Sequence, residues 1–338
     1  MRFARHRTQR GPRLAVLDAE DHLVDLPAHS ELPALLAEDG RLADTAATAL
    51  RTRLRVTPLT TADLMAPLDP PTVRDFSIFP EHTAGIVKTL DPSGGTPPEF
   101  WEIPTFYFSH PYATIGPHDD VPVPPGAQRF DYELEAAAVV GAAGSDLSVE
   151  EAASHIAGFV VLNDFSARDV QFHEMRMRLG PAKGKDTATA LGGFFVTVDV
   201  LRERRSGASF DLTMEVRVNG ELLGSDRLDT MAWSFEALAA YASRGTWIRP
   251  GDLLGSGTCP GGCGRDDELS QAGTHGGPLP VEGERQVLAE MWGRHGDDFH
   301  RPLQPGDTVT TSVELLGETR NRVVAGTKPR DLQPWSRP

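Results

Sequence analysis

Two glutamates separated by a single residue, Glu133 and Glu135, have a spacing that could support chemistry. They lie in the stretch FDYELEAAAVVG, residues 130–141. In a β-strand, residues i and i+2 share a face and sit about 7 Å apart at roughly 3.3 Å per residue, whereas in a helix they do not face each other. Flanking aromatic residues and valines favour the strand. Two such carboxylates repel, and a divalent cation such as magnesium would relieve the repulsion. The alternative is a solvated strand face.

A third carboxylate, Asp164, follows the apolar run in GFVVLNDFSARD, residues 158–169. A side chain at the end of a buried strand emerges from the packed sheet into a site. Asp164 could therefore complete a set of three carboxylates with Glu133 and Glu135, leaving the remaining positions of an octahedral ion to water or substrate oxygens. The alternative is that Asn163-Asp164 is only a turn that ends the strand.

The loop GPAKGKD, residues 180–186, superficially resembles a phosphate-binding loop. Only three residues separate its glycines, and Asp186 stands where a serine or threonine should coordinate magnesium, so nucleotide binding is rejected. Its lysines, Lys183 and Lys185, could still neutralise a substrate carboxylate or oxyanion. The alternative is that both are simply solvated.

The two cysteines, Cys259 and Cys263, have a spacing seen in zinc sites. Zinc would need two further ligands, and His275 is the only candidate nearby, so loop cysteines are the favoured interpretation. Among the histidines, His82 is notable for its aromatic and acidic surroundings just past Asp75. From the residues alone it reads as structural.

The composition describes an ordinary globular protein that is not a nucleic-acid binder. The 338 residues are 39% hydrophobic and 24% charged, enough for one large domain and a small one. A net charge of −15 argues against nucleic acid as a partner, because binding to its phosphates needs a basic surface. No apolar run approaches 18 residues, which predicts no membrane span. The basic start, MRFARHRTQRG, is not followed by an apolar segment, so we expect no secretory signal and a cytoplasmic protein.

The elements that must position these residues divide into two parts. Residues 13–26 predict a hairpin and residues 31–54 a helix, which together form a small N-terminal α/β module over residues 1–68. Prolines then mark a linker. Residues 69–330 have the short apolar runs and the many glycines and prolines of a β-rich domain. Within it, Asn219-Gly220 predicts a hairpin over residues 211–223, and a helix is expected around residues 234–243.

Taken in order, five motifs resemble the fumarylacetoacetate hydrolase family over about residues 73–324. They are FDYELEAAAVVG, GFVVLNDFSARDVQ, GPAKGKDTATALG, PGDLLGSGT and LQPGDTVTTSVELLGETRN. The resemblance implies an α+β, β-rich fold: a mixed β-sandwich or β-roll catalytic domain preceded by a small N-terminal domain, usually in a homodimer.

The resemblance also implies a site. It places magnesium, with calcium or manganese as alternatives, on Glu133, Glu135 and Asp164. The other residues that match family positions are the substrate- or oxyanion-binding Arg168, Gln171 and Lys185, the site-lining Thr189 and Thr258, the lid histidine His82, and Glu290, which would pair with a histidine to activate water.

The chain departs from the family pattern in several places. Residues 265–284 look inserted ahead of Glu290, and Phe108 stands where members often have lysine. Where the prototype hydrolase takes a further metal-ligand aspartate, Thr105 or Phe106 is found, which leaves three protein carboxylates. Tyr112 best matches a histidine of the prototype, although His110 is close by.

The expected function is a metal-dependent hydrolase that cleaves a carbon–carbon bond in a 1,3-diketo acid of acylpyruvate or fumarylacetoacetate type, through a metal-bound enolate. His82, oriented by Glu290 or Glu81, would activate water, while Lys185 and Arg168 would stabilise the oxyanion. The alternatives are an oxaloacetate-type decarboxylase or a keto–enol isomerase, and more remotely a non-catalytic dimeric metal-binding protein. The expected partner is a small keto acid, with no nucleic acid and no membrane.

Overall fold

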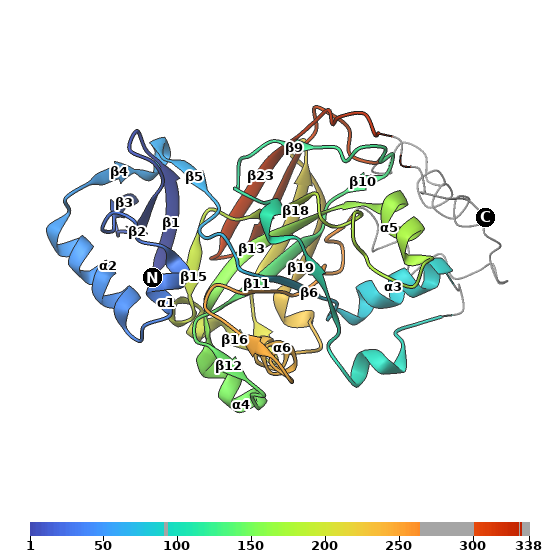
Figure 1. The fold of residues 1–338 in the computed structure, drawn as a ribbon, viewed down its shortest axis with the longest axis horizontal. Helices are drawn as coiled ribbons and strands as arrows, with labels where there is room; N and C mark the ends of the chain where they lie inside the picture. The colour runs from blue at the N-terminus through green and yellow to red at the C-terminus, as the bar shows by residue number, and fades with distance from the viewer. Residues whose placement is uncertain (91–93, 264–300, 331, 333–338) are drawn as a thin grey trace.

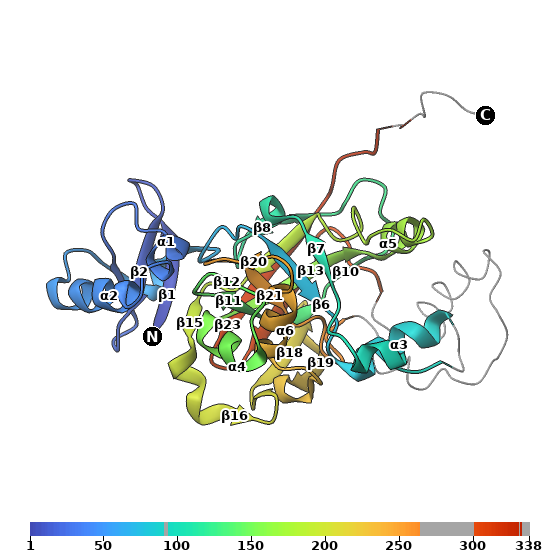
Figure 2. The same cartoon turned by 60° about the horizontal axis from the view of Figure 1, so that its bottom comes forward.

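The computed structural model describes residues 1–90, 94–263, 301–330 and 332. Its framework is two β-sheets packed face to face, with a small module at one end and the helices α3 (Pro80–Leu90) and α5 (Arg168–Met175) at the other (Figures 1 and 2). None of the helices within those residues is long and apolar enough to cross a membrane.

The N-terminal module forms the hairpin that the sequence predicts, but its helix is split in two. Its elements are β1 (Arg2–Arg7), β2 (Arg13–Leu17), β3 (His22–Asp25), α1 (Leu32–Leu36), α2 (Arg41–Thr52), β4 (Val56–Pro58) and β5 (Asp63–Met65). The single helix expected over residues 31–54 is interrupted at Gly40, whose φ of 69° is a left-handed conformation that glycine adopts without strain.

The main sheet runs without a break from this module into the larger part of the chain. The strand order is β4-β3-β2-β1-β15-β13-β11-β21-β6-β7, with β5, β8, β10 and β14 attached beside it. The strands of this sheet outside the N-terminal module are β6 (Val73–Phe76), β7 (Phe106–Ser109), β8 (Thr114–Ile115), β10 (Phe130–Asp131), β11 (Leu134–Val140), β13 (Ile156–Ala167), β14 (Ala188–Leu191), β15 (Phe195–Thr197) and β21 (Leu253–Gly255). Most pairs are antiparallel, but β21 pairs with β6 in parallel, so the sheet is mixed.

The second sheet has the order β19-β18-β22-β23-β9. Its strands are β9 (Val121–Pro122), β18 (Thr213–Val218), β19 (Glu221–Arg227), β22 (Thr308–Val313) and β23 (Gly317–Val324). Asn219 and Gly220 join β18 to β19 with φ of 54° and 88°, the turn predicted from their dipeptide.

Two further α-helices and two small ribbons complete the α-helices and strands of the described residues. They are α4 (Val149–Ala152), α6 (Phe235–Ala242), β12 (Gly144–Ser145) with β20 (Trp247–Ile248), and β16 (Arg205–Ser206) with β17 (Ser209–Phe210). Ser148 caps α4 through a capping box with Glu151.

Two large hydrophobic clusters lie on opposite faces of the main sheet. One fills the space between the sheets and joins Ala136 and Val161 to Val216 and Val309. The other joins the module to the main sheet. Because β11 and β13 carry apolar side chains on both faces, they are the buried centre of a sandwich, which confirms the predicted mixed β-sandwich.

Candidate active site

Neighbouring strands of the main sheet bring four carboxylates together at one end of the sheet. Glu135 lies in β11, Asp164 in β13 and Asp75 in β6, while Glu133 immediately precedes β11. All four are buried. Between Glu135 and Asp75, β21 presents Gly255, where an added Cβ would lie 2.9 Å from Glu135 Oε2 and 3.0 Å from Asp75 Oδ1. The missing side chain therefore gives the two carboxylates room to approach each other.

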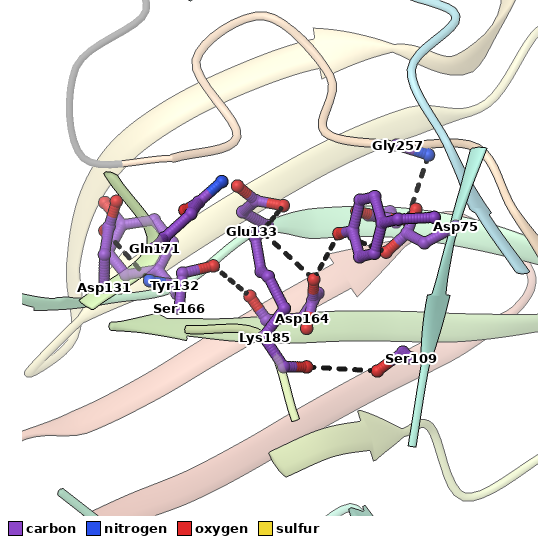
Figure 3. A network of polar contacts seen from close by, with 12 residues as sticks. Asp75, Ser109, Asp131, Tyr132, Glu133, Asp164, Ser166, Gln171, Lys185 and Gly257 are labelled. Carbon is purple, nitrogen blue, oxygen red and sulfur yellow. Dashed lines mark hydrogen bonds and ion pairs between the residues drawn. The ribbon is translucent and has the colours of Figure 1, made fainter. Parts of the chain in front are cut away.

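A buried lysine, Lys185, and a partly buried arginine, Arg168, contact these carboxylates. Figure 3 shows Lys185 with Glu133 and Asp164. Lys185, only 2% exposed, places its Nζ 2.6 Å from Glu133 Oε2 and 3.0 Å from Asp164 Oδ2. Arg168 donates from Nη1 to Glu133 Oε1 and from Nε to Asp131 Oδ2 at 2.9 Å. Both oxygens of Glu133 are thus in contact with a cation.

The pKa values show an excess of buried negative charge. Burial and the neighbouring Asp164 raise the pKa of Asp75 to about 8. Burial and Asp75 hold the pKa of Glu135 well above its usual range, and burial also raises the pKa of Asp164. Burial would also raise the pKa of Glu133, but the positive charges of Lys185 and Arg168 outweigh burial and hold that pKa below the usual range.

Tyr107 of β7 closes the cluster on its other side. Its hydroxyl lies 2.5 Å from Asp164 Oδ2 and 3.0 Å from Asp75 Oδ2. Burial and Asp164 raise the pKa of Tyr107 well above its usual value, so the phenol keeps its proton. The backbone N–H of Gly257 donates to Glu135 Oε2 at 3.0 Å.

Three buried carboxylate oxygens in this cluster accept no hydrogen bond from the described residues. They are Asp75 Oδ1, Glu135 Oε1 and Asp164 Oδ1. Buried polar atoms without partners are costly, and oxygen atoms of this type are the ligands that magnesium, calcium and manganese prefer. These three oxygens are donors that fit a hard divalent cation, whereas both oxygens of Glu133 contact Arg168 and Lys185.

Several predicted site residues lie beside the carboxylates. His82 in α3 is buried, 6% exposed, and is close enough to Glu133 to contribute, after Lys185 and Arg168, to the lowered pKa of that carboxyl. Gln171 accepts a hydrogen bond from Arg168 Nη1 at 3.3 Å. Thr189 is buried and pairs with Ser109 at 3.2 Å. Thr258 is also buried, and its hydroxyl has no hydrogen-bond partner among the described residues.

Other predicted residues are not brought to the cluster. Tyr112 is 94% exposed. Glu81 is exposed and lies near Asp226 instead. Burial raises the pKa of Asp226, and the charge of Glu81 adds to that increase. Glu290, the insertion at residues 265–284 and His275 lie outside the described residues. Of the two cysteines, Cys259 is buried in the core between the sheets.

Sequence reasoning missed Asp75 and Tyr107. It counted three carboxylates, and the structure places a fourth, Asp75, beside them. One local signal was available, because Arg74 and Asp75 are charged residues between Val73 and Phe76 in a strand whose four residues are all buried. The only sequence signal for Tyr107 was the alternation of apolar and polar residues in FYFS, residues 106–109. The second and fourth residues of that stretch, Tyr107 and Ser109, face the cluster.

A second group of potential metal ligands lies far from this cluster, in the hairpin of the N-terminal module. Ligand atoms of Asp18, Glu20 and His22 lie within 4.8 Å of one another. Asp18 already binds Arg53 at 2.6 Å and accepts two backbone N–H groups, so its carboxylate is satisfied without an ion.

Comparison with known proteins supports an assignment at the level of the family. The model of the fumarylacetoacetate hydrolase C-terminal domain matches residues 73–324. A fumarylacetoacetate hydrolase domain-containing protein 2 of Pongo abelii is 37% identical over 147 residues, 44% of this chain and 45% of that protein. A mitochondrial oxaloacetate tautomerase of Homo sapiens is 34% identical over 158 residues, 47% of this chain and 49% of its own.

A fumarylacetoacetase of Arabidopsis thaliana is 30% identical over 228 residues, 58% of this chain and 50% of that enzyme. The matched part of the chain thus spans about half the length of these curated relatives. Among solved structures, a maleylpyruvate hydrolase of Sphingobium sp. SYK-6 matches with a TM-score of 0.67 at 20% identity, over 96% of this chain and 100% of that one. A 5-carboxymethyl-2-hydroxymuconate delta-isomerase of Mycobacterium smegmatis matches with a TM-score of 0.65 at 24% identity, over 96% and 100%.

Proposed function

Because the chain belongs to the fumarylacetoacetate hydrolase family, we propose that it is an enzyme that cleaves a carbon–carbon bond in a 1,3-diketo acid of the acylpyruvate type. The observation that carries this proposal is the buried cluster of four carboxylates around Lys185 and Arg168. Such a cluster is expensive to bury, and structural stability gives no reason to keep it. The Arabidopsis thaliana relative is named a fumarylacetoacetase, which agrees in class.

The residues that would hold a divalent ion are Glu135 and Asp164, joined by Asp75, each of which has an unpaired oxygen. Glu133 would complete the set on giving up its contact with Lys185 or Arg168. Magnesium is the ion proposed, with calcium or manganese as alternatives. When bound, such an ion would act as a Lewis acid on the oxygens of a chelating keto acid. Its support here is the set of three unpaired oxygens and the raised pKa values of the carboxylates that carry them.

The protein's own side chains have separate roles in the proposed hydrolysis. His82 takes a proton from water, and the hydroxide adds to the distal carbonyl. The carbon–carbon bond beside that carbonyl then breaks, which gives a carboxylic acid and an enolate, and the enolate takes up a proton to become the keto acid. Lys185 and Arg168 place positive charge where the substrate carboxylate or the developing oxyanion lies. We propose Glu290 as the partner that orients His82. Gln171, Thr189 and Thr258 are proposed to line the substrate.

Keto–enol tautomerisation is a second candidate, favoured by Tyr107. That reaction needs a proton donor and a proton acceptor but no attacking water. Tyr107 keeps its proton at neutral pH and lies against Asp164, while His82 lies near Glu133. The Homo sapiens relative is named an oxaloacetate tautomerase, which agrees with this alternative. Decarboxylation of a 2-keto diacid would use the same residues without an attacking water.

One experiment separates these candidates. Metal-free protein is titrated with MgCl₂ while thermal stability and the ultraviolet absorbance of the enol are followed, first with an acylpyruvate and then with oxaloacetate. The variants are Glu135→Gln and His82→Asn, with Glu150→Gln on the exposed face of α4 as the control. If the protein is the hydrolase, magnesium causes loss of the acylpyruvate signal and release of a carboxylic acid in the wild type and in Glu150→Gln. Both effects are absent in Glu135→Gln and His82→Asn.

Enol–keto exchange of oxaloacetate without release of carbon dioxide would favour the tautomerase, and release of carbon dioxide would favour the decarboxylase. Magnesium that neither stabilises the protein nor supports turnover of either substrate would exclude the proposed metal enzyme. The thermal readout keeps metal binding separate from the choice of substrate.

A further inference from the structure

Lys185 lies at the end of a connection that contains neither helix nor strand. The chain leaves α5 at residue 175 and enters β14 at residue 188, and the turn between them is mostly exposed. Lys185 itself is nevertheless 2% exposed and holds two carboxylates. A side chain at the end of such a loop keeps its place only if other contacts fix the loop backbone.

Glu174 makes those contacts. Its Oε2 accepts hydrogen bonds from the backbone N–H groups of Ala182 and Gly184, both at 3.1 Å, and its Oε1 accepts one from Lys183 at 2.9 Å. One carboxylate thus binds three successive backbone donors immediately before Lys185. Hydrogen bonds of this kind, from an amide to an ionised carboxylate, are among the stronger ones in proteins.

The position of Glu174 within α5 is not explained by the stability of the helix. It is the penultimate residue of the helix, where the partial negative charge of the helix C-terminus disfavours a carboxylate. The three loop donors offset that unfavourable position. Glu174 therefore serves the loop rather than the helix on which it lies.

The loop backbone is also pressed directly against α5. A Cβ on Gly184 would lie 2.5 Å from Gln171 Cα, so only glycine allows this approach. Gly184 O accepts a hydrogen bond from the N–H of Ala167 at 2.8 Å, at the start of the helix. Since Gln171 and Glu174 are three residues apart, they lie on one face of α5 and contact the same loop.

We propose that Glu174 is a positioning residue that places the Lys185 ammonium between Glu133 and Asp164 by clamping the backbone of residues 182–184. Lys185 is held from the other side by Ser109, which donates to its carbonyl oxygen at 3.1 Å. The hydrogen bonds of Glu174 go to the loop backbone and not to the carboxylate cluster, so its effect on the cluster runs through Lys185. The consequence for turnover rests on the proposed function, whereas the consequence for the position of Lys185 does not.

The test of position is the chemical accessibility of Lys185, with Lys183 as an internal standard. Lys183 is 73% exposed in its side chain and lies two residues away. Holoenzyme is treated briefly with acetic anhydride, and acetylation at each lysine is read by peptide mass spectrometry. In Glu174→Ala we expect the ratio of Lys185 to Lys183 acetylation to rise at least about tenfold, because a single hydrogen bond to a charged group is worth that factor.

The matched control is Glu151→Ala. Glu151 also accepts a backbone hydrogen bond, from Ser148 at 2.9 Å, but at the start of α4 and away from the carboxylates. Its loss lowers stability without changing the acetylation ratio. Glu174→Gln keeps one acceptor oxygen, so its ratio rises less than that of Glu174→Ala, and it carries the test if the alanine variant does not fold. An unchanged ratio in the folded Glu174 variants overturns the proposal.

Turnover gives a second, independent readout. If Glu174 acts through Lys185, Glu174→Ala lowers kcat more than it raises KM, and it lowers kcat no further when added to Lys185→Ala. Equal losses in both backgrounds would refute action through Lys185. If the wild type turns over neither substrate, the proposed function fails, and the acetylation ratio still decides the role of Glu174.

Discussion

At Lys185 a single ammonium group offsets the charge of two buried carboxylates, Glu133 and Asp164. Removing one partner of a buried ion pair leaves the other charges uncompensated in a medium of low polarity. The same ammonium is proposed to stabilise negative charge on the substrate. The contribution of Lys185 to the stability of the fold and its contribution to catalysis should therefore be measured separately.

We predict that Lys185→Met destabilises metal-free protein by about 3 kcal/mol, the usual cost of breaking a buried pair. Urea unfolding followed by circular dichroism measures this free energy. The control is Lys183→Met, because Lys183 forms an exposed pair with Asp186 at 2.8 Å, and such a pair contributes at most about 1 kcal/mol. Equal losses in the two variants would contradict the buried-charge account.

Gly255→Ala is expected to weaken magnesium binding at least about tenfold, the effect of roughly 1.4 kcal/mol of strain in the bound state. The reason is the tight space that the methyl group would share with Glu135 Oε2 and Asp75 Oδ1. Isothermal titration calorimetry with MgCl₂ gives the affinity. Gly95→Ala is the control, since a Cβ there meets nothing within 4 Å. Wild-type affinity in Gly255→Ala would show that the carboxylates do not need this space.

The sequence alone singled out Glu133, Glu135 and Asp164 as candidate site residues, because their spacing and the apolar runs around them are local signals. It was not sufficient for Asp75 and Tyr107. Their place in the cluster depends on the parallel pairing of β6 with β21 and on the pairing of β6 with β7. Pairings between strands so far apart in sequence leave no local period to detect.

Among the elements, the hairpin of β18 and β19 was predictable because its turn chemistry is local. The contact between this turn and Asp307, which precedes the neighbouring strand β22, could not be predicted from the sequence. Asn219 Nδ2 donates to Asp307 Oδ1 at 2.9 Å, and Asp307 also binds Arg301 at 2.7 Å and the N–H of Gln304 at 2.7 Å. Burial raises the pKa of Asp307, but these donors prevail and lower it to about 2.

This depressed pKa predicts acid sensitivity of the second sheet. The stabilising effect of ionised Asp307 is complete above the carboxyl's ordinary pKa, near 4, and is lost as pH falls toward 2. In Asp307→Asn we expect a lower thermal midpoint at pH 7 and a shallower decline of the midpoint between pH 4 and pH 2. Scanning calorimetry across that window measures both. An identical decline in Asp307→Asn and wild type would exclude Asp307 as the group responsible.

The helix expected over residues 31–54 shows the limit of periodicity at this scale. Its leucines recur at helical spacing on both sides of Gly40, but the chain turns there, and the two helices pack on the module's sheet separately. The leucine pattern reports which side chains are buried, and it does not reveal a break between two helices that bury the same face.

For the whole molecule, the N-terminal module and the catalytic sheet share one hydrophobic cluster. Phe3 of β1 lies against Phe195 of β15 with ring centroids 6.2 Å apart, and Leu68 and Val160 belong to the same cluster. The strands β1 and β15 also pair, so the module continues the main sheet. Packing of this kind couples the stability of the two parts.

We therefore predict a single unfolding transition for the full chain and a loss of about 3–5 kcal/mol in Phe3→Ala, the usual cost of a buried phenylalanine. Circular dichroism and tryptophan fluorescence should give coincident curves, since all the tryptophans lie beyond the module. Leu54→Ala, at a residue 86% exposed, is the control and should change stability by less than about 0.5 kcal/mol. Two separated transitions would show that the module folds on its own.

The pairing of β1 with β15 also bears on how the protein is made. Residues 2–7 leave the ribosome early, but their partners at residues 195–197 follow almost 200 residues later. At about 5–20 residues per second, that interval lasts roughly 10–40 seconds. During it, β2 and β5 can pair with β1, but the edge that β15 will occupy remains open. An open strand edge is where other nascent chains can bind, so the same pairing that joins the two parts of the sheet leaves a short edge of β1 exposed while the chain is being made.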